Sequence, residues 1–274
     1  RQAAPQSEDR AAIAFAVYKE LEDLGDTAGA WQALAHGNAV MHGRLRHDAA
    51  AEAGLYAQLG ALAEQGVFST PGAQQTQEPQ PIFVLGLPRS GTTVLERMLG
   101  NHSQIVSAGE LNDFGHQLRW GADQAGRSLL DARLLQAFPT LDYAQIGQRY
   151  LKQTQWRAGG ARWFIDKLPA NAVAIGAIAR ALPNAVIVHL VRDPMAVCFS
   201  NYRALFGDSY AYSYDLTTLA RHYQAYHALM AQASATLSSV QVREGVHARN
   251  VEEWRRYATQ LEPLRQSLLQ AGLI

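Results

Sequence analysis

Arginine, serine, glycine and threonine gather in one short turn between two apolar segments, and this combination can bind a phosphate-like anion. Residues 82–85 are apolar and predict a buried strand, and the residues from 94 onward have helical spacing. The turn between them contains Arg89, Ser90, Gly91, Thr92 and Thr93. The first N–H groups of a helix have no partner within it and lie at the positive end of its dipole. Gly91 lets the backbone approach an anion closely. No Lys follows Gly91, so the motif is not that of the nucleoside triphosphatases.

A second segment repeats the pattern of a strand followed by a basic turn. Residues 186–191 are mostly apolar and predict a buried strand, which ends at Arg192 and is followed by Asp193 and Pro194. Proline is well tolerated in the first turn of a helix, so a helix is expected to begin at Pro194. Ser200 lies eight residues beyond Arg192, about two turns into that helix. Arg192 and Ser200 can therefore reach one external phosphate.

Together the two segments resemble the sulfotransferases that use 3′-phosphoadenosine 5′-phosphosulfate (PAPS). The resemblance is strongest to bacterial sulfotransferases fused to tetratricopeptide repeats, and extends to tyrosylprotein sulfotransferases. It implies that the loop of Arg89, Ser90, Gly91, Thr92 and Thr93 holds the 5′-phosphosulfate. It also implies that Arg192 and Ser200 hold the 3′-phosphate, with 3′-phosphoadenosine 5′-phosphate (PAP) as the product. Sulfotransfer of this kind is expected to need no metal.

The same resemblance implies the catalytic residues. Glu110 stands where the tyrosylprotein enzymes have a Gly-Glu pair whose Glu is the catalytic base. Lys167, in Asp-Lys-Leu-Pro, stands where their Asn-Lys-Asp-Pro has a Lys that acts on the transferring group. Ser238 lies in a Ser-x-x-Gln-Val-like segment and is implied to reach the cofactor. The expected reaction is transfer of a sulfuryl group from PAPS to an acceptor hydroxyl or amine, with the acceptor unidentified.

Alternatives remain open for these residues. Glu110 can be a helix N-terminal charge, Ser200 a buried helical serine that bonds backwards to a carbonyl, and Lys167 a solvated side chain. His102 is a second candidate base, although a capping role suits it better. The tyrosines between 202 and 214 suit an aromatic core better than an acceptor or adenine pocket. At the level of function, the alternatives are a P-loop kinase-like phosphotransferase and a non-catalytic nucleotide-binding repeat scaffold.

Composition limits the classes of protein. The chain has 274 residues, is 48% hydrophobic and has a formal net charge of zero. A large core is expected, and a nucleic-acid partner is not, because such proteins normally carry a basic excess. The single cysteine, Cys198, fits a reducing, cytoplasmic location, and no apolar run approaches the roughly 18 residues of a membrane span. The nine histidines show no metal-ligand spacing.

The expected fold class is α/β, with a P-loop-like parallel sheet between two layers of helices. The predicted domains are a helical tetratricopeptide-like segment with a linker at residues 1–75 and a sulfotransferase domain at residues 76–274. Ile13, Val17, Leu21 and Leu24 predict the first helix, and a second helix starts near residue 28. One such unit cannot bury its own face, so upstream repeats and a protein partner on this segment are expected. A segment is suspected to be missing near residues 231–235.

Overall fold

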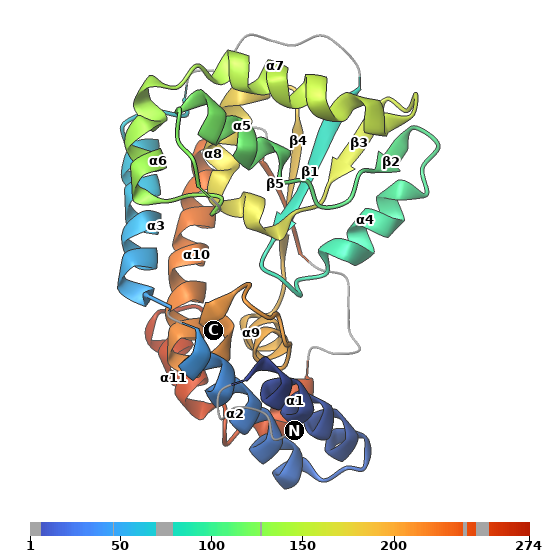
Figure 1. Cartoon of the computed structure of the whole chain (residues 1–274), viewed down its shortest axis with the longest axis vertical. Helices are drawn as coiled ribbons and strands as arrows, with labels where there is room; N and C mark the ends of the chain where they lie inside the picture. The colour runs from blue at the N-terminus through green and yellow to red at the C-terminus, as the bar shows by residue number, and fades with distance from the viewer. Residues whose placement is uncertain (1–6, 46, 70–78, 127, 238–239, 245–251) are drawn as a thin grey trace. The chain divides into compact units, whose positions relative to one another are not determined.

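Five parallel strands form one sheet in the computed structural model (Figure 1), which describes residues 7–45, 47–69, 79–126, 128–237, 240–244 and 252–274. The strand order is β2-β3-β1-β4-β5. The strands are β1 (Gln80–Gly86), β2 (Ile105–Ser107), β3 (Trp163–Asp166), β4 (Val186–Val191) and β5 (Val240–Glu244). The predicted parallel sheet is confirmed, and its central strand β1 is the apolar run that precedes the anion-binding turn.

Helical segments connect the strands and complete the chain. The α-helices are α1 (Glu8–Asp23), α2 (Thr27–Arg44), α3 (Ala49–Glu64), α4 (Thr92–Gly100), α5 (Asp113–Gly121), α6 (Ala132–Ala137), α7 (Tyr143–Thr154), α8 (Ile175–Ala181), α9 (Pro194–Tyr202), α10 (Leu216–Thr236) and α11 (Glu262–Gln270). Short 3₁₀ segments are η1 (Phe138–Thr140), η2 (Gln155–Ala158), η3 (Pro169–Ala174), η4 (Ala211–Tyr214) and η5 (Glu253–Tyr257). Residues 231–235 lie inside α10, and the suspected missing segment there stays a prediction.

Apolar side chains cover both faces of the sheet. Successive residues of a strand point to opposite faces, so neighbouring residues of β1 pack against different helices. On one face Val84 and its neighbours on β3 and β4 pack against Leu95 and Leu99 of α4. On the other face the Phe83 ring lies 6.1 Å from Phe114 of α5 and 5.6 Å from Tyr150 of α7, measured between ring centroids. A parallel sheet buried on both faces is the reason that β1 is an unbroken apolar run.

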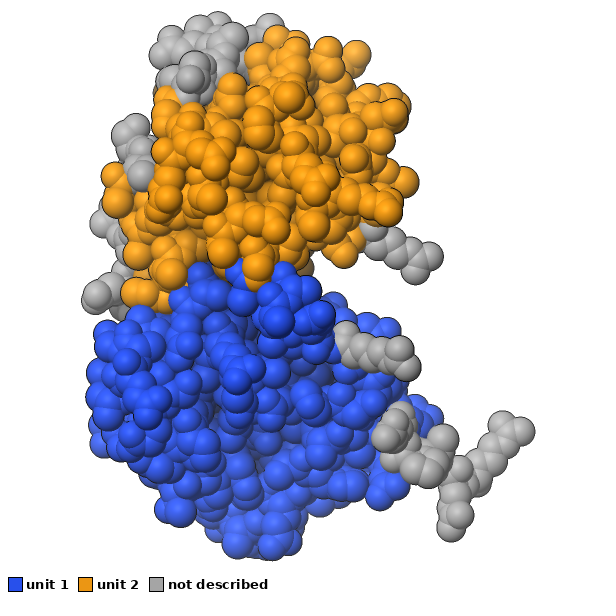
Figure 2. All heavy atoms as spheres, turned by 90° about the vertical axis from the view of Figure 1, so that its left-hand side faces the viewer, with its two compact units in different colours: residues 1–53, 193–226, 246–274 blue, residues 54–192, 227–245 orange. Residues whose placement is uncertain are grey.

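The chain divides into two compact units (Figure 2). Unit 1 contains residues 1–53, 193–226 and 246–274, and unit 2 contains residues 54–192 and 227–245. The whole sheet belongs to unit 2. The predicted domain boundary near residue 75 stays a prediction.

The predicted helical hairpin at the start of the chain is present in unit 1 as α1 and α2. Phe15 of α1 packs so closely on α2 that a Cβ at Gly37 would lie 2.8 Å from its ring. The opposite side of α1 is exposed, since Ile13 and Val17 on it are 62% and 43% exposed. The hairpin is therefore observed, and its descent from a tetratricopeptide repeat stays a prediction. Within the described residues, no helix is both long and apolar enough to cross a bilayer.

Candidate active site

The turn between β1 and α4 has the geometry of an anion cradle. β1 ends at Gly86, and α4 begins at Thr92 with Gly91 as its N-cap at φ 110°. Arg89 also has a left-handed backbone, with φ 69°. Non-glycine residues rarely adopt this conformation, and strained backbone of this kind concentrates at functional sites. The turn directs the first N–H groups of α4 outward, and a helix N-terminus of this kind attracts anions.

A buried hydroxyl in this turn is available to a ligand. The Ser90 side chain is only 3% exposed, and its Oγ has no hydrogen-bond partner among the residues that the structure describes. A buried hydroxyl without a partner is uncommon in proteins and calls for an explanation such as a bound ligand. The turn is packed tightly, since a Cβ at Gly86 would lie 2.8 Å from Ser90 Oγ and 2.9 Å from the Leu190 carbonyl oxygen. A buried hydroxyl beside a helix N-terminus suits the binding of an anion.

Arg192 lies beside the cradle, as the parallel pairing of β1 with β4 requires. Gly86 is aligned with Leu190, so the carboxyl ends of the two strands meet. The Arg192 Nη1 donates a hydrogen bond to the Arg89 carbonyl oxygen at 3.0 Å. Two arginines far apart in the sequence therefore share one edge of the sheet, the edge at which such folds bind ligands.

The other two predicted nucleotide-binding residues are Ser200 and Ser238. Pro194 starts α9 as predicted, and Asp193 caps this helix by accepting a hydrogen bond from the Ala196 N–H at 2.7 Å. Ser200 is buried on α9 in unit 1, whereas Arg192 ends a segment of unit 2. Their shared contact with a 3′-phosphate stays a prediction. Ser238 lies outside the described residues.

Glu110 and Lys167, the two candidate catalytic residues, form an ion pair. Lys167 follows the last residue of β3, and Glu110 follows β2, the neighbour of β3. The Lys167 side chain is 10% exposed, whereas the Glu110 side chain is 53% exposed. The carboxylate is thus open to an acceptor while the ammonium group is almost enclosed.

Glu96 of α4 is a third member of this group that the sequence did not reveal. One of its carboxylate oxygens lies 3.8 Å from Lys167 Nζ, and the other accepts a hydrogen bond from the Ser107 hydroxyl at 2.5 Å. Glu96 is itself only 12% exposed. Its carboxylate can hold the Lys167 ammonium group when Glu110 turns to a substrate. No local sequence signal marks Glu96, because Lys167 follows β3, a strand that is distant in the sequence and pairs with β1, the strand before α4.

Asp166, the residue before Lys167, is fully buried. Burial raises the pKa of the Asp166 carboxyl to about 7, although hydrogen bonds from Tyr150 and Leu111 act in the opposite direction. Desolvation favours the neutral form of a carboxyl group, which explains the direction of this shift.

The structure also places the alternatives considered from the sequence. His102 is exposed, and its Nδ1 accepts a hydrogen bond from the Gln104 N–H at 3.1 Å, which suits a local capping role. Among the tyrosines, Tyr202, Tyr212 and Tyr214 are buried in unit 1, which favours the aromatic-core interpretation.

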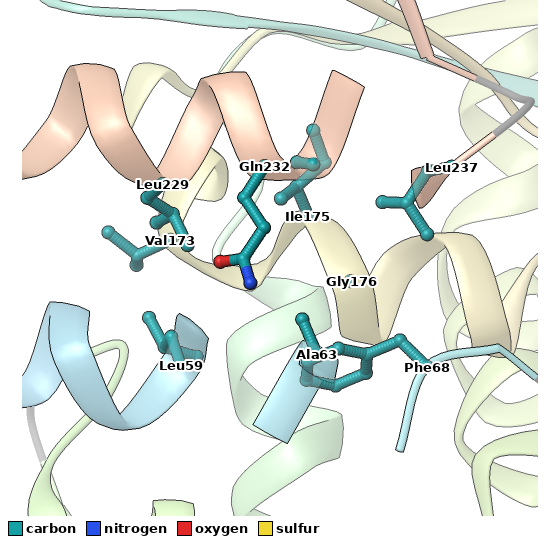
Figure 3. Close-up of a pocket in the computed structure, with 10 residues that line it drawn as sticks. Leu59, Ala63, Phe68, Val173, Ile175, Gly176, Leu229, Gln232 and Leu237 are labelled. Carbon is teal, nitrogen blue, oxygen red and sulfur yellow. The ribbon is translucent and has the colours of Figure 1, made fainter. Parts of the chain in front are cut away.

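Unit 2 also contains an apolar pocket with a different composition (Figure 3). It is lined by residues of α3, η3, α8 and α10, and none of the predicted site residues is among them. Gln232, its polar member, donates a hydrogen bond to the Gly60 carbonyl oxygen at 3.1 Å. The cavity volume of about 20 Å³ is far below the several hundred Å³ of a typical ligand site. It is a packing gap between helices.

Two curated proteins are similar to this chain. An uncharacterized protein from Aquifex aeolicus is 25% identical over 326 aligned positions, which cover 96% of this chain and 42% of that protein. Nodulation protein NoeE from Sinorhizobium fredii is 29% identical over 133 positions, which cover 44% of this chain and 31% of that protein. The chain thus spans less than half the length of either relative.

Two solved structures are more distantly similar. The sulfotransferase domain from the curacin biosynthetic pathway is 23% identical, with 71% of this chain and 75% of that chain covered and a TM-score of 0.43. A sulfotransferase from Alicyclobacillus acidocaldarius is 17% identical, with 73% and 83% covered and a TM-score of 0.37.

The family assignment comes from a family model. The model described as "Sulfotransferase family" matches residues 81–267, which include the cradle, Glu110, Lys167 and Arg192. The match covers more than half of the chain, and so the chain belongs to the sulfotransferase family.

Proposed function

We propose that the chain transfers a sulfuryl group from PAPS to a hydroxyl or amine, with PAP as the second product. The observation that carries the proposal is the cradle at the end of β1, where a buried Ser90 hydroxyl without a hydrogen-bond partner among the described residues lies beside the N-terminus of α4. When bound, PAPS would supply an activated sulfuryl group and a phosphate leaving group. Membership of the sulfotransferase family supports sulfuryl transfer as the class of reaction, and we propose PAPS as the donor.

The nucleotide would be held at two points. Arg89, Ser90, Gly91, Thr92 and Thr93 surround the N-terminus of α4 and would bind the 5′ end through charge and hydrogen bonds. Arg192 is hydrogen-bonded to this loop, and with Ser200 it would bind the 3′-phosphate, while Ser238 would contact the cofactor at a point that the sequence does not specify. Because Arg192 donates a hydrogen bond to the Arg89 carbonyl oxygen, an Arg192 side chain fixed by the 3′-phosphate would also restrain the loop that binds the 5′-phosphosulfate.

Glu110 would act as the general base, and Lys167 would stabilise the leaving group. Glu110 is the more exposed of the pair, and its carboxylate takes the proton from the acceptor. The Lys167 ammonium group faces both Glu110 and Glu96, and it stabilises negative charge that develops on the leaving phosphate. In this scheme Glu96 keeps the ammonium group in place while Glu110 is engaged with the acceptor.

A binding titration and a turnover assay test the proposal. The chain should bind PAP more tightly than adenosine 5′-phosphate or ATP. Radiolabelled PAPS should pass its label to at least one member of a panel containing a tyrosine peptide, a phenol, an amino sugar and an aliphatic alcohol. Equal affinity for PAP and adenosine 5′-phosphate would refute the proposed donor. Tight PAP binding without label transfer to any member of the panel, or to water, would favour a binding protein.

A further inference from the structure

Asp166 is the last residue of β3 and lies in the interior of unit 2. It directly precedes Lys167, and its side chain contacts the segment that carries Glu110. It is fully buried, and burial of a carboxylate is unfavourable unless hydrogen bonds compensate for lost water. Three donors surround it. The Tyr150 hydroxyl donates to Oδ2 at 2.8 Å, and the Leu111 N–H and the Asn171 side-chain amide donate to Oδ1 at 3.4 Å each. The side chain is therefore tied both to α7 and to the segment that follows β2.

The residues on either side of Glu110 are hydrogen-bonded to the end of β3. The Ala108 N–H donates to the Ile165 carbonyl oxygen, and the Lys167 N–H donates to the Gly109 carbonyl oxygen, both at 2.9 Å. The third bond is that from the Leu111 N–H to the Asp166 carboxylate. Two of the three bonds join backbone to backbone, so a change of the Asp166 side chain does not remove their donors or acceptors. Only the third depends on a side chain.

We propose that Asp166 is a positioning residue, whose carboxylate fixes the backbone of Leu111 and thereby holds Glu110 against Lys167. Its effect on turnover rests on the proposed function, whereas its effect on the backbone does not. Without the Asp166 carboxylate, the hydrogen bonds between this segment and the end of β3 would lie only on the N-terminal side of Glu110. Small displacements of a catalytic group can lower the rate by about 10²-fold.

Three variants separate positioning from stability. Asp166→Ala removes the acceptor for Leu111, whereas Asp166→Asn keeps one acceptor oxygen in the same place. Tyr150→Phe removes the strongest hydrogen bond to Asp166 and leaves the bond to Leu111 intact, so it is the matched control for loss of a buried polar contact. Each variant is characterised by its melting temperature, its affinity for PAP and the hydrogen-exchange rate of the Leu111 amide.

The expected results differ between the variants. Asp166→Ala should exchange the Leu111 amide about fivefold faster or more, because a buried hydrogen bond is lost. Its kcat in the PAPS assay should fall by about 10- to 10²-fold while its PAP affinity stays that of the parent. Asp166→Asn should restore most of the exchange protection and most of the kcat. Tyr150→Phe should melt at a lower temperature and still retain the parental Leu111 exchange rate and kcat.

The inference fails if Asp166→Ala leaves the Leu111 exchange rate unchanged, or if Tyr150→Phe accelerates exchange and lowers kcat as much as Asp166→Ala does. If Asp166→Ala does not fold, the double variant Asp166→Leu/Tyr150→Phe replaces it, because removing both buried polar groups at similar volume is tolerated better. A parent that turns over no PAPS would refute the proposed function. The exchange measurement would still decide whether Asp166 holds the Glu110 segment.

Discussion

Lys167 is ion-paired with Glu110 across 57 residues of sequence, at the ends of two adjacent strands. The pair combines an enclosed ammonium group with an exposed carboxylate. An ion pair of this kind can separate when a substrate arrives, because one partner is still solvated and the other has Glu96 nearby. The proposed base and the proposed stabiliser of the leaving group are therefore in direct contact.

Glu110→Gln tests the proposed base. The amide keeps the shape of the side chain but cannot accept a proton, so turnover should fall by about 10²- to 10⁴-fold. PAP affinity, measured by calorimetry, should match that of the parent. The melting temperature should change little, since half-exposed ion pairs contribute about 1 kcal/mol or less. His102→Gln is the comparison variant. Parental turnover by Glu110→Gln together with a loss in His102→Gln would transfer the role of base to His102.

Arg192→Ala tests the 3′-phosphate site. Charge-assisted hydrogen bonds contribute about 1.5–3 kcal/mol, so the preference for PAP over adenosine 5′-phosphate should shrink by about 10- to 100-fold. Arg162→Ala is the matched control, because Arg162 precedes β3 at the opposite end of the sheet from the cradle. An equal loss in both variants would mean that only the net positive charge of the protein matters.

Ser90→Ala tests the cradle. The Ser90 hydroxyl is buried without a partner among the described residues, so its removal should leave the melting temperature unchanged or slightly raised. PAP affinity should nevertheless fall by about 10-fold, because the lost bond is one to a charged group. A lower melting temperature with parental PAP affinity would assign the hydroxyl a purely structural role.

Two glycine substitutions test the packing of unit 2. A Cβ at Gly176 would lie 2.5 Å from a ring carbon of Phe68, beside the apolar pocket of Figure 3. Gly176→Ala should destabilise by about 1–3 kcal/mol through overpacking. Gly54→Ala should instead stabilise by about 0.5–1 kcal/mol, because Gly54 lies within α3 and a Cβ there would meet nothing within 4 Å. Urea denaturation of both variants measures the difference, and destabilisation by Gly54→Ala would contradict this packing.

Asp166 should make stability depend on pH. Its pKa is about 7 in the folded chain against a reference value of 3.8, with burial as the main cause. Between these values the folded state binds more protons than the unfolded state, so the Asp166 contribution to stability falls as pH rises through this window. Asp166→Asn lacks this titration. The melting temperature of the parent relative to Asp166→Asn should therefore decrease from about pH 5 to about pH 8, and a constant difference would mean that Asp166 is charged throughout.

The elements that carry the site follow from local sequence, whereas several contacts within it do not. The apolar runs of β1 and β4 and the helix start at Pro194 are read from residue types alone, and all are confirmed. β2 has only three residues, and its pairing with β3 brings Glu110 to Lys167, while the pairing of β1 with β3 brings Glu96 to the same lysine. These contacts follow from long-range strand pairing.

The first helix shows a second limit of sequence patterns. The spacing of Ile13 and Val17 correctly predicts α1, yet these residues face away from α2. The packed side instead contains Ala11, Ala14 and Phe15, opposite Gly37 of α2. Small residues allow two helix backbones to approach closely, and hydrophobic periodicity does not reveal that preference.

The register of β1 has a consequence for the rate of folding. Its partners lie far along the chain, with Gln80 aligned to Trp163 and Ile82 aligned to Val186. Long loops must close before these strands gain any hydrogen bond, and proteins rich in such distant contacts fold slowly. The cradle and Arg192 cannot meet until β4 has docked on β1. In a refolding experiment the capacity to bind nucleotide should therefore appear with the slow phase, after most helical signal has returned.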